Sequence, residues 1–333
     1  MNKHRPIILA IVGDSAAGKS TLTNGLVQIL GAERVTVLCT DDYHKYDRRE
    51  RAELKITPLH PDCNYMDVLE LHLERLHYGQ PFLKPVYDHS TGTLIRPEYI
   101  RPREFVIVEG LLGFHSPAMR QFYDVKVFLD PPEDLRTAWK IKRDTSKRGY
   151  TPEQVLTEMK KREADTQRFI RPQREHADIV VRFHADEGVK PEDAGPNLNV
   201  QLVLRPTIPH PDLTYLIEGT HHDPTDIRLR LGRDGGRPVD FLEIAGNVSA
   251  ENAQRLEDAI WQHLPDLRPV REDQFGDYQD RMEIKHSHPL ALSQLLITYH
   301  LLRKYSNMAQ IPMAPPIAAL SRLQSTTPST DSG

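Results

Sequence analysis

The segment Gly13-Asp-Ser-Ala-Ala-Gly-Lys-Ser20 has the spacing G-x-x-x-x-G-K-[ST], which is typical of a loop that binds phosphate groups. Its two glycines let backbone N–H groups curl around phosphates, and the N-terminus of a following helix adds partial positive charge. Lys19 would bridge the β- and γ-phosphates of a nucleoside triphosphate, and Ser20 would hold Mg²⁺. A chance glycine-rich turn is the alternative, but an apolar stretch precedes the loop and a helical pattern follows it. We therefore predict a triphosphate site formed by Gly13, Asp14, Ser15, Ala16, Ala17, Gly18, Lys19, Ser20 and Thr21.

A carboxylate, Glu109, directly follows the apolar residues 105–108. The carboxyl end of a strand beside the phosphate loop is where an acid that organises the metal ion is needed. We expect Ser20 and Glu109 to hold the metal together. The alternative is a glutamate that only ends the strand at Gly110.

The charged segment D-D-Y-H-K-Y-D-R-R, residues 41–49, directly follows the apolar residues 35–39. Strand ends of this kind face the ligand crevice of an open α/β sheet. Asp41 could there accept the proton of an attacking hydroxyl, as a kinase of a small metabolite requires. His44, Arg48 and Arg49 could bind a phosphate that the substrate already carries. A solvated charged loop is the alternative.

The helical pattern at residues 134–147 carries Lys140, Arg143, Asp144 and Lys147 on one face, at i, i+3, i+4 and i+7. A surface helix with internal salt bridges would show the same spacing. Because the helix follows a strand end in a chain with a phosphate loop, we expect it to form a lid over the triphosphate.

Continuous apolar runs predict buried strands at residues 6–12, 35–39, 105–108 and 125–129. Helical patterns follow the first strand and cover 134–147 and 151–170, the last opened by Thr151-Pro152. Strands that alternate with helices predict an α/β fold with a mostly parallel sheet flanked by helices.

The pattern changes after residue 184, where a segment rich in charge, glycine and proline suggests a surface connection. Short strand patterns follow at 198–204, 213–218, 227–231 and 239–244, with a hairpin turn at 233–237. Helices are predicted at 250–263 and 289–305. We therefore expect a kinase core at 1–184, a β-rich and helical extension at 185–305, and a disordered tail at 306–333.

The composition is that of a soluble globular protein, with 38% hydrophobic and 27% charged residues and a formal net charge of −4 among 333 residues. No overall basic field points to nucleic acid or to an anionic membrane. No apolar run is long enough to span a bilayer, and two cysteines, Cys39 and Cys63, favour a reducing compartment. We expect a cytoplasmic protein without nucleic-acid or membrane partners.

Residues 140–153 fit K-x-x-R-D-x-x-x-R-G-x-[ST]-x-E at every fixed position, and this pattern resembles the signature of the phosphoribulokinase family. The segments D-D-Y-H-x-x-D-R, Y-D-H-S-T-G at 87–92 and F-I-R-P-Q at 169–173 also resemble that family, and the likeness covers roughly residues 5–185. The resemblance implies a homo-oligomeric enzyme that uses ATP and Mg²⁺ to phosphorylate D-ribulose 5-phosphate at its 1-hydroxyl.

The same resemblance implies a role for each matching residue. Asp41 would be the general base, and Lys19, Lys140 and Asp144 would be the other catalytic residues. Arg143 would contact both nucleotide and substrate. The residues implied in substrate binding are His44, Arg48, Arg49, Tyr87, His89, Arg143, Arg148 and Arg162.

Two other functions remain open. A uridine kinase or another small-metabolite kinase of the same superfamily would share the phosphate loop, Asp41 and Glu109, but uridine carries no phosphate for His44 and Arg48 to bind. A regulator switched by nucleotide would need no base such as Asp41. Plant and cyanobacterial members of the resembling family have a cysteine in the phosphate loop, whereas this loop has none, which argues against a thiol switch there.

Overall fold

The computed structural model describes residues 5–190, 198–213, 226–263, 275–280 and 283–309. Its centre is an eight-stranded sheet with the order β2-β5-β1-β6-β7-β8-β10-β9. Five strands are parallel: β1 (Ile7–Gly13), β2 (Val35–Cys39), β5 (Phe105–Gly110), β6 (Val125–Leu129) and β7 (Ile179–His184). Every residue of β1 is buried, as expected of a strand covered on both faces. The predicted α/β fold with a mostly parallel sheet is confirmed, and β7 was not predicted.

Three antiparallel strands continue the same sheet beyond β7. They are β8 (Asn199–Leu204), β10 (Arg237–Ile244) and β9 (Ile227–Asp234). Gly235 and Gly236 join β9 to β10 with φ of 56° and 81°, which is the backbone that a tight hairpin requires. The predicted hairpin at 233–237 is therefore confirmed. The strand predicted at 213–218 falls mainly on residues 214–225, which lie outside the described residues.

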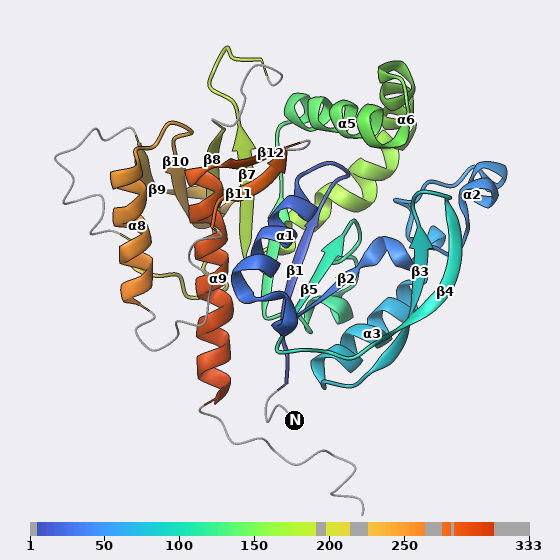
Figure 1. Cartoon of the computed structure of the whole chain (residues 1–333), viewed down its shortest axis with the longest axis horizontal. Helices are drawn as coiled ribbons and strands as arrows, with labels where there is room; N and C mark the ends of the chain where they lie inside the picture. Colours follow the sequence, from blue (N-terminus) through green and yellow to red (C-terminus); the bar gives the residue numbers. More distant parts are fainter. Residues whose placement is uncertain (1–4, 191–197, 214–225, 264–274, 281–282, 310–333) are drawn as a thin grey trace, which may run out of the picture.

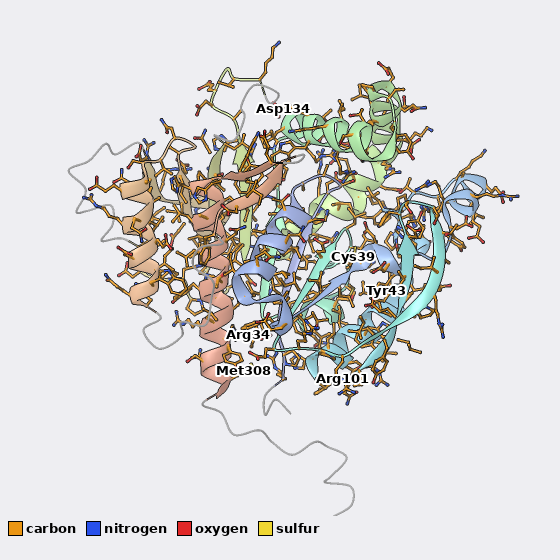
Figure 2. The ribbon with its side chains drawn as sticks, viewed as in Figure 1. Arg34, Cys39, Tyr43, Arg101, Asp134 and Met308 are labelled. Carbon is orange, nitrogen blue, oxygen red and sulfur yellow. The ribbon has the colours of Figure 1, made fainter. Side chains whose placement is uncertain are left out.

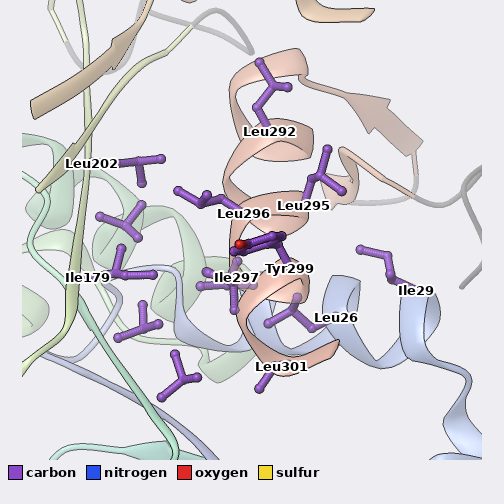
Figure 3. Packing of buried hydrophobic residues seen from close by; sticks show 14 of the residues in the cluster. Leu26, Ile29, Ile179, Leu202, Leu292, Leu295, Leu296, Ile297, Tyr299 and Leu301 are labelled. Atoms are coloured by element: carbon purple, nitrogen blue, oxygen red, sulfur yellow. The ribbon is translucent and has the colours of Figure 1, made fainter. Parts of the chain in front are cut away.

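Helices cover both faces of the sheet (Figure 1). α1 (Lys19–Leu30), α8 (Ala250–Gln262) and α9 (His288–Ala309) pack on one face, whereas α3 (Met66–His77) and α4 (Pro117–Arg120) pack on the other. Figure 3 shows Leu26 of α1 and Ile297 of α9 in one cluster with Ile179 and Leu202 of the sheet. α9 continues to Ala309, beyond its predicted end at residue 305. No helix among these residues is long and apolar enough to cross a bilayer.

α1 and α9 approach each other closely at Gly25. A Cβ atom on Gly25 would lie 2.0 Å from Nε2 of Gln294. The Oε1 of the same glutamine accepts a hydrogen bond of 2.8 Å from the backbone N–H of Gly276. The extension and the helix that follows the phosphate loop therefore share one core.

Several elements beside the sheet were not predicted, α3 and α4 among them. α2 (Arg48–Leu54) buries none of its residues, and β3 (Phe82–Asp88) pairs with β4 (Thr93–Ile100) in a separate hairpin. A second small hairpin joins β11 (Asp277–Asp280) to β12 (Glu283–His286).

The helix predicted to form a lid is α5 (Glu133–Arg148). α6 (Pro152–Asp165) follows it, and both helices, together called the lid, lie at one end of the sheet in Figure 1. Thr151 caps α6 as predicted, because its hydroxyl accepts from the N–H of Gln154 and Oε1 of Gln154 accepts from the N–H of Thr151. The helix predicted over 151–170 continues after Asp165 as a π-helical turn, Thr166–Ile170, and then as the 3₁₀-helical turn η5 (Arg171–His176).

Candidate active site

The phosphate loop joins β1 to α1 and is held by its own lysine. Ala16 and Gly18 have φ of 66° and 94°, so the loop turns twice through the left-handed region. Nζ of Lys19 donates to the carbonyl oxygens of Gly13 (2.9 Å) and Asp14 (2.8 Å). Burial lowers the pKa of Lys19, whereas the nearby carboxylates oppose that shift. A triphosphate would give the buried ammonium a stronger partner than these two carbonyls.

Glu109 lies beside the first turn of α1. The parallel register of β1 and β5 sets it opposite Ile11, and its two oxygens accept from the hydroxyls of Ser20 (3.4 Å) and Thr23 (2.9 Å). A hydroxyl and a carboxylate are the oxygen donors that Mg²⁺ prefers, so the pair fits this ion. The contact with Thr23 was not predicted, although Thr23 lies one helical turn after Ser20. Thr21 is exposed and Ala17 is buried.

The two neighbouring aspartates after β2 have different surroundings. Asp42 is buried and accepts from Nζ of Lys84 and from the backbone N–H of Tyr87 (3.1 Å). Asp41 is half-buried, and within the described part of the chain its carboxylate has no hydrogen bond or ion pair. Its negative charge nevertheless acts on Lys19 and His44, because it opposes the lowering of their pKa values by burial. Asp42 therefore anchors the β3–β4 hairpin, and Asp41 is the carboxylate available to a substrate.

His44 is buried next to Asp41 and has a defined tautomer. The amide of Asn64 donates to the carbonyl oxygens of Pro58 (3.1 Å) and His60 (2.9 Å), which leaves Oδ1 of Asn64 as an acceptor for Nδ1–H of His44 at 2.6 Å. Burial lowers the pKa of His44. The ring also packs edge-to-face on Tyr87, with centroids 4.9 Å apart. Nε2 of His44 is consequently the nitrogen that can meet a ligand.

Arg48 lies across the turn between β3 and β4. Its backbone N–H donates to the carbonyl oxygen of Gly92 (2.8 Å), and its guanidinium donates to that of His89 (2.7 Å). Gly92 has a φ of 78°, and a Cβ atom there would lie 2.7 Å from Nε of Arg48. Asp88 shapes the turn by accepting from Ser90 and Thr91, and these bonds lower its pKa to about 2. The segment Y-D-H-S-T-G therefore forms a support for Arg48.

The neighbouring cations take different directions. The Arg49 side chain is 87% exposed and pairs with Glu53 at 2.9 Å. The structure therefore does not bring the Arg49 guanidinium together with that of Arg48. His89 is exposed, with its ring 5.0 Å from that of Tyr87. Arg51 was not predicted, yet it donates to the hydroxyl of Tyr87 (2.6 Å) and to the carbonyl oxygen of Tyr46 (2.7 Å). Its position one helical turn after Arg48 is the signal that could have found it.

The lid helix α5 contacts the phosphate loop through its cations. Lys140 and Arg143 both donate to the hydroxyl of Ser15, each at 3.3 Å, and both pair with Asp144, at 3.2 and 2.8 Å. Burial, with a smaller contribution from Arg143, lowers the pKa of Lys140 to about 8, although Asp144 opposes the shift. Arg136 extends this face and pairs with Asp14 at 3.1 Å. It was not predicted, although it lies one helical turn before Lys140.

Two predicted substrate contacts come from the end of the lid. Arg162 is half-buried, donates weakly to Glu158 (3.5 Å) and lowers the pKa of Lys140, so it lies within electrostatic reach of the site. The side chain of Arg148 lies outside the described residues.

Both cysteines are free thiols. Cys39 ends β2, close to the site, and Figure 2 shows it beside Tyr43. Burial raises the pKa of Cys39 well above its usual value and raises that of Cys63 to about 11. Both are therefore protonated, weak nucleophiles at neutral pH.

A phosphate loop after the first strand of a mostly parallel sheet, carboxylates at the ends of β5 and β2 and a cationic helix over the loop define a P-loop kinase. The chain belongs to the Phosphoribulokinase / Uridine kinase family, whose family model matches residues 8–190.

Individual relatives extend this match. The chain is 34% identical to a phosphoribulokinase of Synechocystis sp. over 266 residues, which cover 76% of this chain and 79% of that protein. It is 29% identical over 234 residues to the chloroplastic phosphoribulokinase of Spinacia oleracea, and spans 58% of that protein's length. A uridine kinase of Chloroflexus aurantiacus is 33% identical over 181 residues, which cover 53% of this chain and 86% of that protein.

Similarity to a solved structure supports the same fold. A phosphoribulokinase from Rhodobacter spheroides superposes with a TM-score of 0.56 and 19% identity, over 79% of this chain and 95% of that one. The likeness covers more of the chain than the family model does, so part of the extension shares the fold as well.

Proposed function

We propose that the protein transfers the γ-phosphoryl group of ATP to the 1-hydroxyl of D-ribulose 5-phosphate and forms ribulose 1,5-bisphosphate and ADP. The observation that carries this proposal is that a carboxylate without a hydrogen bond and an arginine held by its own turn lie on one short segment. Of the two aspartates after β2, Asp41 is the one whose carboxylate has no hydrogen bond or ion pair in the described chain, and Arg48, seven residues later, lies on a dedicated support. A five-carbon sugar phosphate has its reacting hydroxyl and its phosphate at opposite ends, which suits such a segment.

The chemistry needs a base, a phosphoryl acceptor and positive charge. Asp41 accepts the proton of the 1-hydroxyl as that oxygen bonds to the γ-phosphorus, and the bond to the oxygen bridging the β- and γ-phosphates breaks, releasing ADP. Lys19, Lys140 and Arg143 neutralise the charge on the oxygens of the transferring group. Asp144 holds both lid cations in place, as its bonds of 3.2 and 2.8 Å indicate. Mg²⁺ held by Ser20 and Glu109 would neutralise the β- and γ-phosphates further.

The 5-phosphate is proposed to bind at His44 and Arg48, with the ring of Tyr87 packed edge-to-face against the imidazole. Nε2 of His44 can donate to a phosphate only when the ring is protonated, and a bound dianion would raise the pKa that burial lowers. We also propose a cytoplasmic, homo-oligomeric enzyme; the resemblance to the family supports the assembly.

Phosphorylation of uridine is the second candidate, favoured by the 33% identity to a uridine kinase. That match spans 181 residues, whereas the match to the Synechocystis phosphoribulokinase spans 266 and continues into the extension. Uridine also offers no anion to Arg48. Both observations favour the sugar phosphate.

An assay of ADP release with each acceptor tests the proposal. We expect turnover with ATP, Mg²⁺ and ribulose 5-phosphate, and no turnover above the hydrolysis background with uridine. Turnover of uridine alone would replace the proposed acceptor, and ATP binding without turnover of either compound would favour a regulator.

A further inference from the structure

One ion pair closes the base of the lid. Asp130 directly follows β6 and precedes the lid, whereas Arg174 lies in η5, after α5 and α6. Nε of Arg174 donates to Oδ2 of Asp130 at 2.8 Å. The two residues where the lid leaves and rejoins the sheet are therefore joined directly, although 44 positions separate them in the sequence.

The extension supplies a second carboxylate to the same guanidinium. Asp234, the last residue of β9, accepts from Nη1 of Arg174 at 2.7 and 2.8 Å. Asp234 also accepts from Arg205 at 2.8 Å, and Arg205 in turn donates to the carbonyl oxygens of Arg174 (2.8 Å) and Ala177 (3.0 Å). Asp234 is therefore linked to η5 twice, directly through the Arg174 side chain and indirectly through Arg205.

Exposure shows which partner fixes Arg174. The side chains of Arg174 and Asp130 are 26% and 35% exposed, and an ion pair this open to water gives little orientation by itself. Asp234 and Arg205 are 14% and 5% exposed, so their bonds form in a less polar environment and are stronger. Asp234 in the β9–β10 hairpin therefore fixes the position of the Arg174 guanidinium, and Asp130 pairs with the guanidinium in that position.

We propose that Asp234 is a positioning residue for the catalytic lid. By fixing Arg174, it keeps the two ends of the lid together and holds Lys140 and Arg143 over the phosphate loop. The extension then contributes to phosphoryl transfer without touching either substrate. This role does not depend on which acceptor the kinase uses.

Trp139 can report the position of the lid. It lies on α5, and a Cβ atom on Gly18 of the phosphate loop would be 3.8 Å from its indole ring. The chain has two tryptophans, and the other, Trp261, is in α8. The substitution Trp261→Phe leaves Trp139 as the sole source of indole emission.

The test uses the full chain with Trp261→Phe and compares Asp234→Asn with Glu243→Gln. Glu243 is a matched control because it also lies in the hairpin but pairs with Arg230, at 3.4 Å. We expect Asp234→Asn to reduce kcat about 3- to 30-fold, which lies within the range of coupling observed inside one salt-bridge network. It should also change the Trp139 emission and its response to added ADP. The control should leave both unchanged, and Asp234→Glu should recover part of the loss.

The double variant decides between positioning and general stability. If Asp234 acts through Arg174 and Asp130, Asp234→Asn and Asp130→Asn should be strongly non-additive in log kcat. A lower unfolding temperature with control-like kcat and emission, or additive effects, would overturn the proposal. If Asp234→Asn does not fold, Arg174→Lys takes its place, because lysine keeps the charge but cannot hold both carboxylates in a fork. The emission response to ADP needs no acceptor, so it remains interpretable if the proposed substrate is wrong.

Discussion

Lys140 should make catalysis depend steeply on pH. Burial, aided by Arg143 and opposed by Asp144, lowers the pKa of its ammonium from 10.5 to about 8. Each unit of pKa corresponds to about 1.4 kcal/mol, so the site disfavours the charged form by about 3 kcal/mol relative to water. Because we propose that the charged form stabilises the transferring phosphoryl group, kcat/KM for ATP should be constant below about pH 8 and fall about tenfold per unit above it.

Two variants test whether the pH at which kcat/KM begins to fall, the alkaline break, belongs to Lys140. Asp144→Asn removes the carboxylate that opposes the shift, so the break should move to lower pH. Lys140→Arg carries a guanidinium that stays protonated, so the alkaline loss should disappear even if overall activity falls. The break in kcat should lie at higher pH than that in kcat/KM, because a bound triphosphate favours the charged lysine.

The measurement is a profile of initial rates from pH 6.5 to 10, with the coupling enzymes in excess at every pH. Incubation at each pH followed by assay at pH 7.5 separates titration from denaturation. An unchanged alkaline break in Lys140→Arg would refute the assignment, and so would a flat profile for the natural protein.

Three further outcomes follow from the site. Asp41→Asn should lower kcat by about 10²- to 10⁴-fold and leave KM for ATP unchanged, because an amide cannot accept the proton; half of the original kcat would place the base elsewhere. Arg48→Ala should raise KM for ribulose 5-phosphate about 10- to 100-fold, from the loss of about 1.5–3 kcal/mol, and a change confined to ATP would contradict this. Burial lowers the pKa of His72 to about 4, so folding stability should fall by up to about 3 kcal/mol as the pH drops from 6.5 to 4. His72→Gln, measured by urea unfolding, should lose this part of the pH dependence, and an equal slope in both proteins would exclude it.

The core of the fold was predictable because its signals are local. The buried strands are continuous apolar runs, and the spacing of the phosphate loop is fixed by the size of a phosphate group. The hairpin β3–β4 gave no such signal, since nearly every residue of β4 is exposed. Likewise α2 buries none of its residues and therefore shows no apolar periodicity.

Where two adjacent residues carry the same charge, tertiary contacts decide which of the two faces the site. Asp41 and Asp42 are equivalent by composition, and only the buried Lys84 shows that the second is an anchor. Arg48 and Arg49 are separated by about 100° around a helix, so one of them points away once Asp47 fixes the start of α2. The ion pairs that Arg174 makes with Asp130 and Asp234 join residues far apart in the chain, and no sequence pattern encodes them.

The transfer of a phosphoryl group to the 1-hydroxyl is most directly tested with ribulose 5-phosphate that carries ¹⁸O at that hydroxyl. After reaction with ATP and Mg²⁺, ³¹P NMR should show a second phosphate ester shifted by a bridging ¹⁸O, with ADP formed in equal amount. Asp41→Asn should form this product far more slowly. An ester without the bridging label, or ADP that accumulates only with inorganic phosphate, would contradict the account.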